Sequence, residues 1–597
     1  MGVLSAIRRE RETLSGLLSV LGRIKDVKPD AELTIADKID QWAEKNPNKE
    51  AIVFEDQTIS YGELSDKATQ IANWALNAGV KRGDTIALVM ENKPEYIMTW
   101  YAAAKAGFSV ALINTNLQGL GLAHTLNISN AGHIVLDSNL ADNYASCVDH
   151  LDRPMTVWAQ GGAIQGAHSW DDAVAAEAGK PLPGGLRDGL LAKERFVYIY
   201  TSGTTGLPKA ANISHQRFVG MGGAFAGATK STEDDRVYVC LPLYHATGGV
   251  GGVSIALTAG GTLILRRKFS ASAFFNDCIK YRATIFVYIG ELCRYLLNAP
   301  ENPNEQKHKL RIAMGNGLRP EVWEPFQKRF AIPRIVEFYG STEGNVALFN
   351  VNNKVGSIGR IPSYLSGMMQ TKIVKFDVEN EEVVRGPDGH CIECAFDEVG
   401  EAIGKIDPDK PGANFEGYNN KEATEKKILR DVFEPGDKWF RTGDLLKKDK
   451  QGYFYFIDRI GDTFRWKGEN VATSEVAEVM SQIPQIKEAN VYGVQVPGAD
   501  GRAGMASIVV EGDLDFAKLE AILDRDLAAY AQPMFLRLQP EMEVTGTFKH
   551  RKVELVKEGF NPAEINEPLY FRNPQTGHFE ELTGDVYTAI CEGGIRL

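Results

Sequence analysis

The sequence predicts an α/β protein: a large N-terminal domain of packed parallel and mixed sheets with helices plus a β-rich subdomain, and a smaller α+β C-terminal domain. Two observations lead to this prediction. From about residue 50 to residue 355, short apolar runs alternate with amphipathic stretches, as in strands joined by helical crossovers. Short β-rich pieces with many turns then fill residues 355–457, and a second α/β pattern covers residues 475–558.

The composition is that of an acidic globular protein. The 597 residues include 66 Lys and Arg against 78 Asp and Glu, a formal charge of −12, and 44% are hydrophobic. This length allows about two to four packing units, and the composition excludes disordered, collagen-like and coiled-coil chains. Because the net charge repels polyanions, we expect no nucleic acid partner, and any phosphate site must be local.

Residues 1–34 are predicted to form an amphipathic N-terminal helix and a linker. Apolar residues recur at helical spacing up to Ile24, beside an excess of basic residues. Such a helix can lie on a membrane surface. The alternatives, packing on its own domain or on a second subunit in a homodimer, stay open. Residues 26–33 are polar and aperiodic, which indicates the linker.

The N-terminal domain is predicted to span residues 35–457 and to begin with a helix. Thr34 lies three residues before Asp37, and this spacing is typical of a capping box. Residues 246–265 carry no charge and are numerous enough to span a membrane. Their glycines favour a buried helix and strand instead. Residues 458–561 are predicted to form the C-terminal domain, and residues 562–597 a tail.

A loop rich in glycine and hydroxyl groups follows a predicted strand at residues 196–200 and ends at a lysine. Glycines let backbone N–H groups approach an anion, hydroxyls add donors, and the lysine adds charge. The loop therefore predicts a phosphate site, formed by Thr201, Ser202, Gly203, Thr204, Thr205, Gly206 and Lys209. It is not the P-loop of nucleotide triphosphatases, because the lysine follows the second glycine by three positions.

Four further motifs follow this loop along the chain. They are Leu241-Pro-Leu-Tyr-His-Ala-Thr-Gly248, Tyr339-Gly-Ser-Thr-Glu343, Phe440-Arg-Thr-Gly-Asp444 and Thr545-Gly-Thr-Phe-Lys549. In this order they resemble the signature of the adenylate-forming (AMP-binding) superfamily. The strings at residues 288–295, 337–345 and 458–470 resemble more closely the fatty acid transport protein and very-long-chain acyl-CoA synthetase family, over residues 35–575.

This resemblance implies an AMP-forming ligase that joins a long-chain fatty acid to coenzyme A. A carboxylate is a poor acyl donor, so it first attacks the α-phosphate of ATP and pyrophosphate leaves. Mg²⁺ and lysine offset the charge that builds on the phosphate oxygens. The CoA thiolate then attacks the acyl adenylate and AMP leaves. The alternatives are a fatty acyl-AMP ligase that passes the acyl group to a carrier protein, and a fatty acid binding or transport protein.

The resemblance also assigns site residues. Glu343 would bind Mg²⁺, Thr342 would contact the α-phosphate, and His245 belongs to the histidine motif. An adenine slot and ribose contacts complete the ATP site, from Gly315, Asn316, Gly317, Tyr339, Gly340, Ser341, Asp444 and Arg459. An ionised aspartate suits two ribose hydroxyls because it only accepts hydrogen bonds.

Lys549 is the expected catalytic lysine, since an ammonium group can follow charge from the carboxylate to the α-phosphate. The superfamily usually has glycine directly before this lysine, whereas Phe548 stands here, which leaves Lys552 as a rival. The resemblance implies that the C-terminal domain is mobile and swivels between the two half-reactions. The hinge would lie at Asp458 and Gly461, and glycine gives a pivot backbone freedom.

Glycines follow His245 at the start of a predicted helix, although each costs about 1 kcal/mol there relative to alanine. We therefore predict that they open an apolar tunnel for the acyl chain, with Tyr244 and His245 at its mouth, lined by Gly248, Gly249 and Gly252. Close helix packing is the alternative reading of these glycines.

The sequence predicts residence in the cytoplasm, with peripheral attachment at the inner face of the membrane as an added expectation. No signal peptide is found at the N-terminus, and the substrates ATP and CoA are cytoplasmic. The seven cysteines, an odd number, argue for a reducing compartment. Cys391 and Cys394 form a C-x-x-C pair without a second pair to complete a zinc site, so we interpret them as structural thiols.

Overall fold

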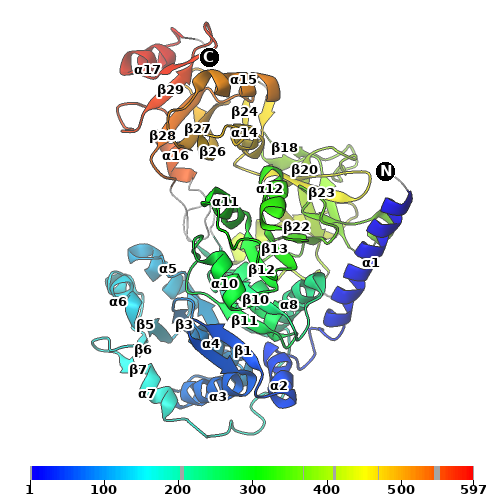
Figure 1. Cartoon of the computed structure of the whole chain (residues 1–597), viewed down its shortest axis with the longest axis vertical. Helices are drawn as coiled ribbons and strands as arrows, with labels where there is room; N and C mark the ends of the chain where they lie inside the picture. The colour runs from blue at the N-terminus through cyan, green and yellow to red at the C-terminus, as the bar shows by residue number, and fades with distance from the viewer. Residues whose placement is uncertain are drawn as a thin grey trace. The chain divides into compact units, whose positions relative to one another are not determined.

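The computed structural model describes residues 3–201, 208–367, 369–378, 380–407, 412–467, 469–499, 501–542, 552–595 and 597 (Figure 1). The chain forms two compact units. Unit 1 comprises Met1–Leu318, Phe326–Arg360 and Lys405–Leu429, and unit 2 comprises Arg319–Pro325, Ile361–Gly404 and Arg430–Leu597. The β-rich segment thus belongs mostly to the same unit as the C-terminal region, while the swivel boundary after residue 457 stays a prediction.

Unit 1 begins with helices α1 (Val3–Ile24) and α2 (Ile35–Lys45). α1 packs on α8 (His215–Thr229) of the same unit. The capping box before α2 is confirmed, because the Asp37 carboxylate accepts a hydrogen bond of 2.7 Å from the Thr34 amide.

The first sheet of unit 1 is mainly parallel and has seven strands in the order β7-β6-β5-β3-β4-β8-β9. Their bounds are β3 (Thr85–Val89), β4 (Ser109–Leu112), β5 (His133–Asp137), β6 (Thr156–Gln160), β7 (His168–Ser169), β8 (Arg195–Thr201) and β9 (Lys209–Ser214). Only β8 and β9 are antiparallel neighbours. The helices among these strands include α3 (Tyr61–Asn77), α4 (Pro94–Ala106) and α5 (Gly119–Ser129).

The second sheet of unit 1 has eight strands in the order β15-β14-β13-β12-β10-β11-β1-β2. Their bounds are β1 (Glu50–Phe54), β2 (Gln57–Ser60), β10 (Arg236–Val239), β11 (Thr262–Leu265), β12 (Ile285–Ile289), β13 (Ile312–Asn316), β14 (Ile335–Gly340) and β15 (Ala347–Asn350). The two outermost pairs are antiparallel and the rest are parallel. Helices α10 (Phe274–Lys280) and α11 (Gly290–Asn298) precede and follow β12.

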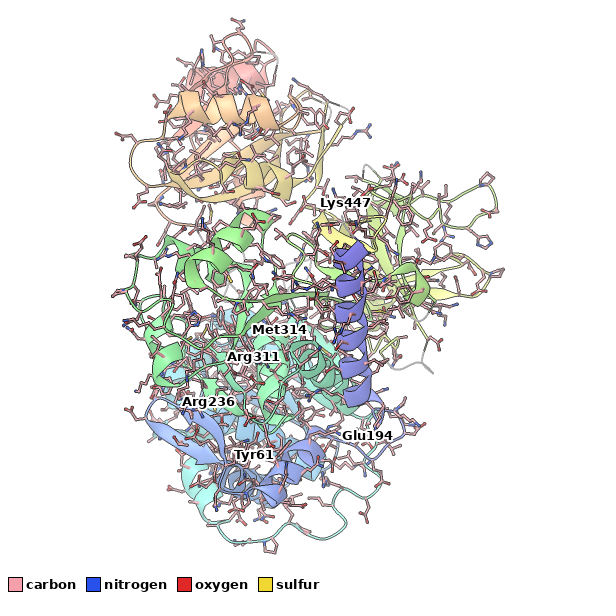
Figure 2. The ribbon with its side chains drawn as sticks, turned by 45° about the vertical axis from the view of Figure 1, so that its right-hand side comes forward. Tyr61, Glu194, Arg236, Arg311, Met314 and Lys447 are labelled. Carbon is pink, nitrogen blue, oxygen red and sulfur yellow. The ribbon has the colours of Figure 1, made fainter. Side chains whose placement is uncertain are left out.

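Polar side chains link these strands to their neighbours; Figure 2 marks Arg236, Arg311 and Tyr61, which take part. Arg311 lies 2.7 Å from Asp235, and Arg236 lies 2.6 Å from Glu50. The Tyr61 hydroxyl, at the start of α3, donates a 2.7 Å hydrogen bond to a backbone carbonyl just before β11.

The uncharged run at residues 246–265 forms a π-helix, η3 (Ala246–Gly252), then α9 (Val253–Leu257) and β11. α9 and β11 are buried, which confirms the predicted core helix and strand. Within the described ranges, no helix is both long and apolar enough to cross a membrane.

Unit 2 contains two larger sheets, the second of them C-terminal and five-stranded. The first includes β23 (Tyr453–Arg459), β22 (Lys438–Lys448), β20 (Gly400–Lys405) and β17 (Thr371–Val374) in that order, with antiparallel β17–β20 and β22–β23 pairs. The second has the order β26 (Ile486–Gln495), β27 (Arg502–Val510), β28 (Phe535–Gln539), β29 (Leu569–Arg572) and β30 (Phe579–Glu581). Helices α14 (Thr473–Met480), α15 (Phe516–Asp526), α16 (Val553–Glu558) and α17 (Gly584–Cys591) complete this region.

The predicted tail at residues 562–597 is wrong. β29 and β30 extend the C-terminal sheet, and their apolar side chains Leu569, Phe571 and Phe579 join its hydrophobic core. The polar turn between the two strands hid their short alternating pattern, since each strand has only three or four residues.

Phe571→Ala should therefore destabilise the C-terminal region by about 3–5 kcal/mol, the usual cost of removing a buried phenyl ring. Phe571 is 1% exposed and stands opposite Phe535 in the sheet. Hydrogen exchange of β28 and β29 amides measures the effect. Gln575→Ala in the exposed turn is the control, and equal exchange in both variants would contradict the core role of β29.

Candidate active site

The predicted phosphate loop connects two paired strands. Thr201 at the end of β8 stands opposite Lys209 at the start of β9 in the antiparallel register. Both ends of the loop are thus fixed side by side. Ser202, Gly203, Thr204, Thr205 and Gly206 lie outside the described residues, so their part in a phosphate site stays a prediction.

A segment distant in sequence reaches the base of this loop. Tyr418 forms a β-bridge with Ala211 of β9, and its ring centroid lies 5.7 Å from the Lys209 ammonium nitrogen. The Tyr418 hydroxyl donates a 2.7 Å hydrogen bond to the buried Glu343 carboxylate. Burial, followed by the charge of Glu343, raises the pKa of Tyr418 well above its usual value, so this hydroxyl stays a neutral donor.

Arg217 of α8 holds the loop that carries Glu343. Its guanidinium donates to the backbone carbonyl of Thr342 at 2.9 Å, to that of Ser341 at 3.4 Å, and also to that of Gly344. Burial lowers the pKa of Arg217, while Glu416 and Glu343 oppose that shift. An arginine fork that binds successive carbonyls fixes the conformation of the backbone between them.

The predicted adenine slot lies at the carboxyl ends of neighbouring parallel strands, where open α/β sheets bind ligands. Gly315 and Asn316 end β13, and Tyr339 and Gly340 end β14 beside it. Gly317 follows with a φ of +77°, which glycine adopts without strain.

A buried carboxyl group lies beneath this slot. Glu337 of β14 is 1% exposed and accepts hydrogen bonds from the Leu318 amide at 3.0 Å and from the Tyr288 hydroxyl. Burial raises the pKa of Glu337 to about 8, although these donors oppose the shift. Glu337 thus ties β12 and β14 to the end of the slot.

The histidine motif contacts the predicted adenine slot through Thr247, two residues after His245. Thr247 in η3 donates a 3.2 Å hydrogen bond to the Asn316 side chain. His245 caps η3, and its ring lies 4.5 Å from that of Tyr244, centroid to centroid. Asn116 donates a 3.1 Å hydrogen bond to the Tyr244 hydroxyl. These contacts bring Tyr244 and His245 into the same region as the slot.

Three glycines of η3 pack closely against neighbouring backbone or side-chain atoms. A Cβ at Gly248 would lie 2.6 Å from the Pro242 carbonyl oxygen, and a Cβ at Gly249 would overlap the Leu243 carbonyl oxygen. A Cβ at Gly252 would lie 2.7 Å from the Val239 side chain. Close packing, the alternative reading of the sequence, therefore accounts for these glycines, and their part in an acyl tunnel stays a prediction.

Unit 2 carries the predicted ribose and hinge residues. Asp444 and Arg459 stand opposite each other on β22 and β23, and their charged groups lie 3.7 Å apart. Asp458 is 3% exposed and accepts hydrogen bonds from the Thr473 amide at 2.6 Å and its hydroxyl at 3.1 Å. Burial raises the pKa of Asp458. Gly461 has a φ of +92°, and a Cβ there would meet no atom within 4 Å, while its part in a hinge stays a prediction.

Of the two candidate catalytic lysines, Lys549 and Lys552, the structure describes only Lys552. Lys552 donates a 2.8 Å hydrogen bond to the Thr473 hydroxyl and lies 3.3 Å from the Asp462 carboxylate. It is thus engaged in a structural cluster within unit 2. Lys549 lies outside the described residues.

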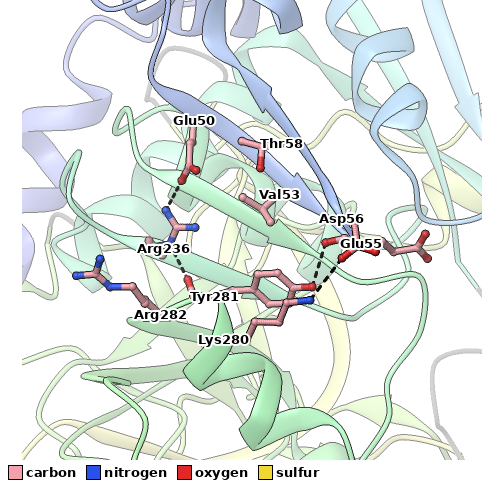
Figure 3. A pocket seen from close by; sticks show the side chains of 9 residues that line it. All are labelled: Glu50, Val53, Glu55, Asp56, Thr58, Arg236, Lys280, Tyr281 and Arg282. Carbon is pink, nitrogen blue, oxygen red and sulfur yellow. Dashed lines mark hydrogen bonds and ion pairs between the residues drawn. The ribbon is translucent and has the colours of Figure 1, made fainter.

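A polar pocket of unit 1 contains none of these motif residues (Figure 3). Its lining includes ion pairs of Arg236 with Glu50 at 2.6 Å and of Lys280 with Asp56 at 3.5 Å. Paired charges neutralise one another, so this pocket has no surplus of charge to attract ATP.

Among the residues that the structure describes, no three His, Cys, Asp or Glu side chains gather as a metal site. A single buried carboxylate near a phosphate loop still fits Mg²⁺, which in nucleotide sites binds one or two carboxylates together with phosphates and water. Glu343 is that carboxylate.

Comparisons with known proteins show the family of the chain. The model of the AMP-binding enzyme family matches residues 39–391, and that of the AMP-binding enzyme C-terminal domain matches residues 475–549. Long-chain fatty acid transport protein 6 of Mus musculus is 40% identical over 95% of this chain and 91% of its own. The chain belongs to the AMP-binding enzyme family. Within it, the chain is a member of the long-chain fatty acid transport protein family.

A second relative and two solved structures are similar to the chain over most of its length. Long-chain fatty acid transport protein 2 of Rattus norvegicus is 41% identical over 93% of this AMP-binding enzyme and 90% of its own chain. A benzoate CoA ligase from Burkholderia xenovorans LB400 superposes with a TM-score of 0.73 at 21% identity, over 88% of this chain and all of that one. ATP-bound MatB from Rhodopseudomonas palustris gives 0.72 at 23%, over 88% and 99% of the two chains. These structures show the adenylate-forming fold.

Three residues that support the site were not predicted from the sequence as site residues: Tyr418, Arg217 and Glu337. Glu337 stands two positions before Tyr339 on the same strand, so strand alternation could have placed both on one face. No local signal pairs Tyr418 with Glu343, 75 positions away.

Glu337→Gln should change how the stability of this enzyme depends on pH. The folded pKa of about 8 exceeds the unfolded value, so stability from this carboxyl is complete below the unfolded pKa and is lost as pH rises through 8. From pH 6 to pH 8 the variant should gain about 2 kcal/mol relative to the native enzyme. Denaturant unfolding at both pH values measures this, and parallel pH profiles would contradict a protonated Glu337.

Tyr418→Phe should weaken ATP binding in the presence of Mg²⁺ by about tenfold, because hydrogen bonds to charged groups contribute roughly 1.5–3 kcal/mol. The hydroxyl orients the Glu343 carboxylate. Calorimetric titration without fatty acid measures binding alone. The exposed Tyr364 gives the matched control, Tyr364→Phe. An unchanged ATP affinity in Tyr418→Phe would show that the hydrogen bond does not orient a metal ligand.

Proposed function

We propose that this AMP-binding enzyme is a long-chain or very-long-chain fatty acid–CoA ligase. The observation that carries the proposal is the gathering of Lys209, Glu343 and the slot around Gly315 at adjoining strand ends in unit 1. A cation, a metal-type carboxylate and a flat slot are what ATP requires of a site. The relatives named long-chain fatty acid transport proteins indicate the class of acid.

In the first half-reaction the fatty carboxylate attacks the α-phosphate of ATP, one P–O bond forms, and the bond to pyrophosphate breaks. Thr201 and Lys209 would bind the β- and γ-phosphates with the loop between them, and Thr342 would contact the α-phosphate. Glu343 would hold Mg²⁺, which supplies charge neutralisation on the phosphates when bound. Tyr339 would stack on the adenine, and Asp444 would accept hydrogen bonds from the ribose.

In the second half-reaction the CoA thiolate attacks the acyl carbonyl, a thioester forms and AMP leaves with the electron pair. Transfer to a carrier protein shares the first half-reaction and remains the second candidate. A passive fatty acid binding protein would have no use for the joined cation, carboxylate and nucleotide slot. Because ATP and CoA are cytoplasmic, we propose that the enzyme acts there.

We assign adenylation to Lys549 rather than Lys552. The hydrogen bond of Lys552 to Thr473 and its ion pair with Asp462 give it a structural task, and a lysine held there is not available to follow charge on the substrate. The Thr545-Gly-Thr-Phe-Lys549 form is typical of the family, and this resemblance supports Lys549.

Lys549→Ala should lower fatty acid-dependent exchange between pyrophosphate and ATP by about a hundredfold or more, as expected for removing a group that stabilises transition-state charge. Thioester formation from ATP, Mg²⁺, CoA and fatty acids of graded length is measured alongside. Lys552→Ala is the matched control and should keep the exchange activity.

The outcomes separate the alternatives. Pyrophosphate release without thioester would identify an acyl-AMP ligase. No ATP-dependent product from any acid would favour the binding protein. Loss of exchange in Lys552→Ala, with activity kept in Lys549→Ala, would reverse the assignment of the catalytic lysine.

A further inference from the structure

Helix α1 is fixed to the rest of unit 1 by hydrogen bonds of its polar side chains. The Thr13 hydroxyl lies 3.0 Å from the Asn352 side-chain oxygen and accepts a 2.8 Å hydrogen bond from Arg360. Lys230, just beyond α8, donates a 2.7 Å hydrogen bond to the Ser15 hydroxyl. These contacts set the rotation of the helix about its axis, because each requires one face of α1 to point inward.

Close approach to α8 reinforces this orientation. A Cβ at Gly227 would lie 2.6 Å from the Cα of Val20, and a Cβ at Gly223 would lie 2.9 Å from the Ile24 side chain. The glycines of α8 therefore let the two helix backbones come together. In Figure 1, α1 lies at the margin of this unit, next to α8.

The opposite face of α1 exposes long apolar side chains. They recur every three, four or seven positions and form one stripe: Leu4 at 84% exposure, Ile7 at 59%, Leu14 at 43%, Leu18 at 67% and Leu21 at 37%. A shallow apolar depression lies along the middle of this stripe, between Ile7, Leu14 and Leu18. The stripe is about 26 Å long at the helical rise of 1.5 Å per residue. An amphipathic helix usually buries such a face, and here the fold turns it to solvent.

The charges beside the stripe are positive. Arg8, Arg11 and Lys25 are exposed. The two carboxylates of α1 are both in ion pairs, Glu10 with Arg360 and Glu12 with Arg8. The outward face thus combines leucines with cations, although the whole chain has a formal charge of −12.

From these observations we propose that the outward face of α1 docks on a bilayer surface that contains anionic lipid. A linear apolar stripe flanked by cations is the pattern of helices that lie in the plane of a membrane interface. The cations act locally, because the net negative charge of the molecule would otherwise repel such a surface. The evidence for the docking face comes from α1 alone. Its biological role rests on the proposed function, because long-chain fatty acids partition into bilayers and a docked ligase would meet them there.

Flotation of the full chain with vesicles tests the proposal. The native protein should float with vesicles of equal parts phosphatidylcholine and phosphatidylglycerol, and poorly with phosphatidylcholine alone. Leu14→Gln with Leu18→Gln should reduce partitioning at least tenfold, because each leucine loses its transfer into the acyl boundary. Arg8→Gln with Arg11→Gln should reduce it by about fivefold for each cation, and less at high salt.

Leu120→Gln provides the matched control, since Leu120 is 68% exposed on α5, away from α1. It should float like the native protein. Thermal unfolding should be nearly equal in all variants, because the substituted leucines are largely exposed and the Arg8–Glu12 ion pair lies at the surface, where such pairs contribute little. Thioester formation from a short, water-soluble acid should also be equal, so a failure of the ligase activity is separable from a failure of docking.

Two results would overturn the proposal. One is equal flotation of the native protein and Leu14→Gln/Leu18→Gln, or no flotation with anionic vesicles. The other is that the native protein is a dimer and the Leu14→Gln/Leu18→Gln variant a monomer, with no vesicle binding by either protein. The stripe would then be covered by a second copy of the chain.

Discussion

The hydrogen bond between Tyr418 and Glu343 joins the parts of the site in unit 1. Tyr418 belongs to a segment that pairs with β9 at the base of the phosphate loop, whereas Glu343 stands on the loop after β14. These strands lie in different sheets. This bond connects the Glu343 carboxylate directly to the segment that pairs with the strand carrying Lys209.

The loop after β14 is also held by Arg217 of α8. Arg217 binds three of its carbonyls, which fixes these peptides with their oxygens toward α8. Glu337 supports the slot through a different contact, because it accepts a hydrogen bond from the Leu318 amide just beyond β13.

Sequence reasoning found the elements of this fold because each has a local cause. The Thr34–Asp37 capping box, the apolar strands and the motif loops at their carboxyl ends are signals within a few residues. The supporting contacts have no local cause, since Tyr418 and Arg217 act on a loop that the topology brings to them. β29 and β30 were missed because a strand of three or four residues shows too few alternations to be recognised.

α1 shows a different limit. The sequence correctly predicted an amphipathic helix, but periodicity says only that one face is apolar, and a globular protein normally turns that face inward. Here the glycines of α8 and the hydrogen bonds of Thr13 favour the opposite rotation. Exposure of the leucine stripe is therefore a property of two helices together, and only the structure of both could reveal it.

The end of the chain belongs to the fold of unit 2 and is fixed to it by a buried arginine. The family model of the C-terminal domain ends at residue 549, whereas the fold continues through α16 and β29. Arg537 on β28 binds Glu558 at the end of α16, and it also donates to Glu567, two positions before β29, at 2.9 Å. One buried guanidinium therefore ties α16 and the segment before β29 to β28. These added elements are thus part of the same packed fold rather than an appendage to it.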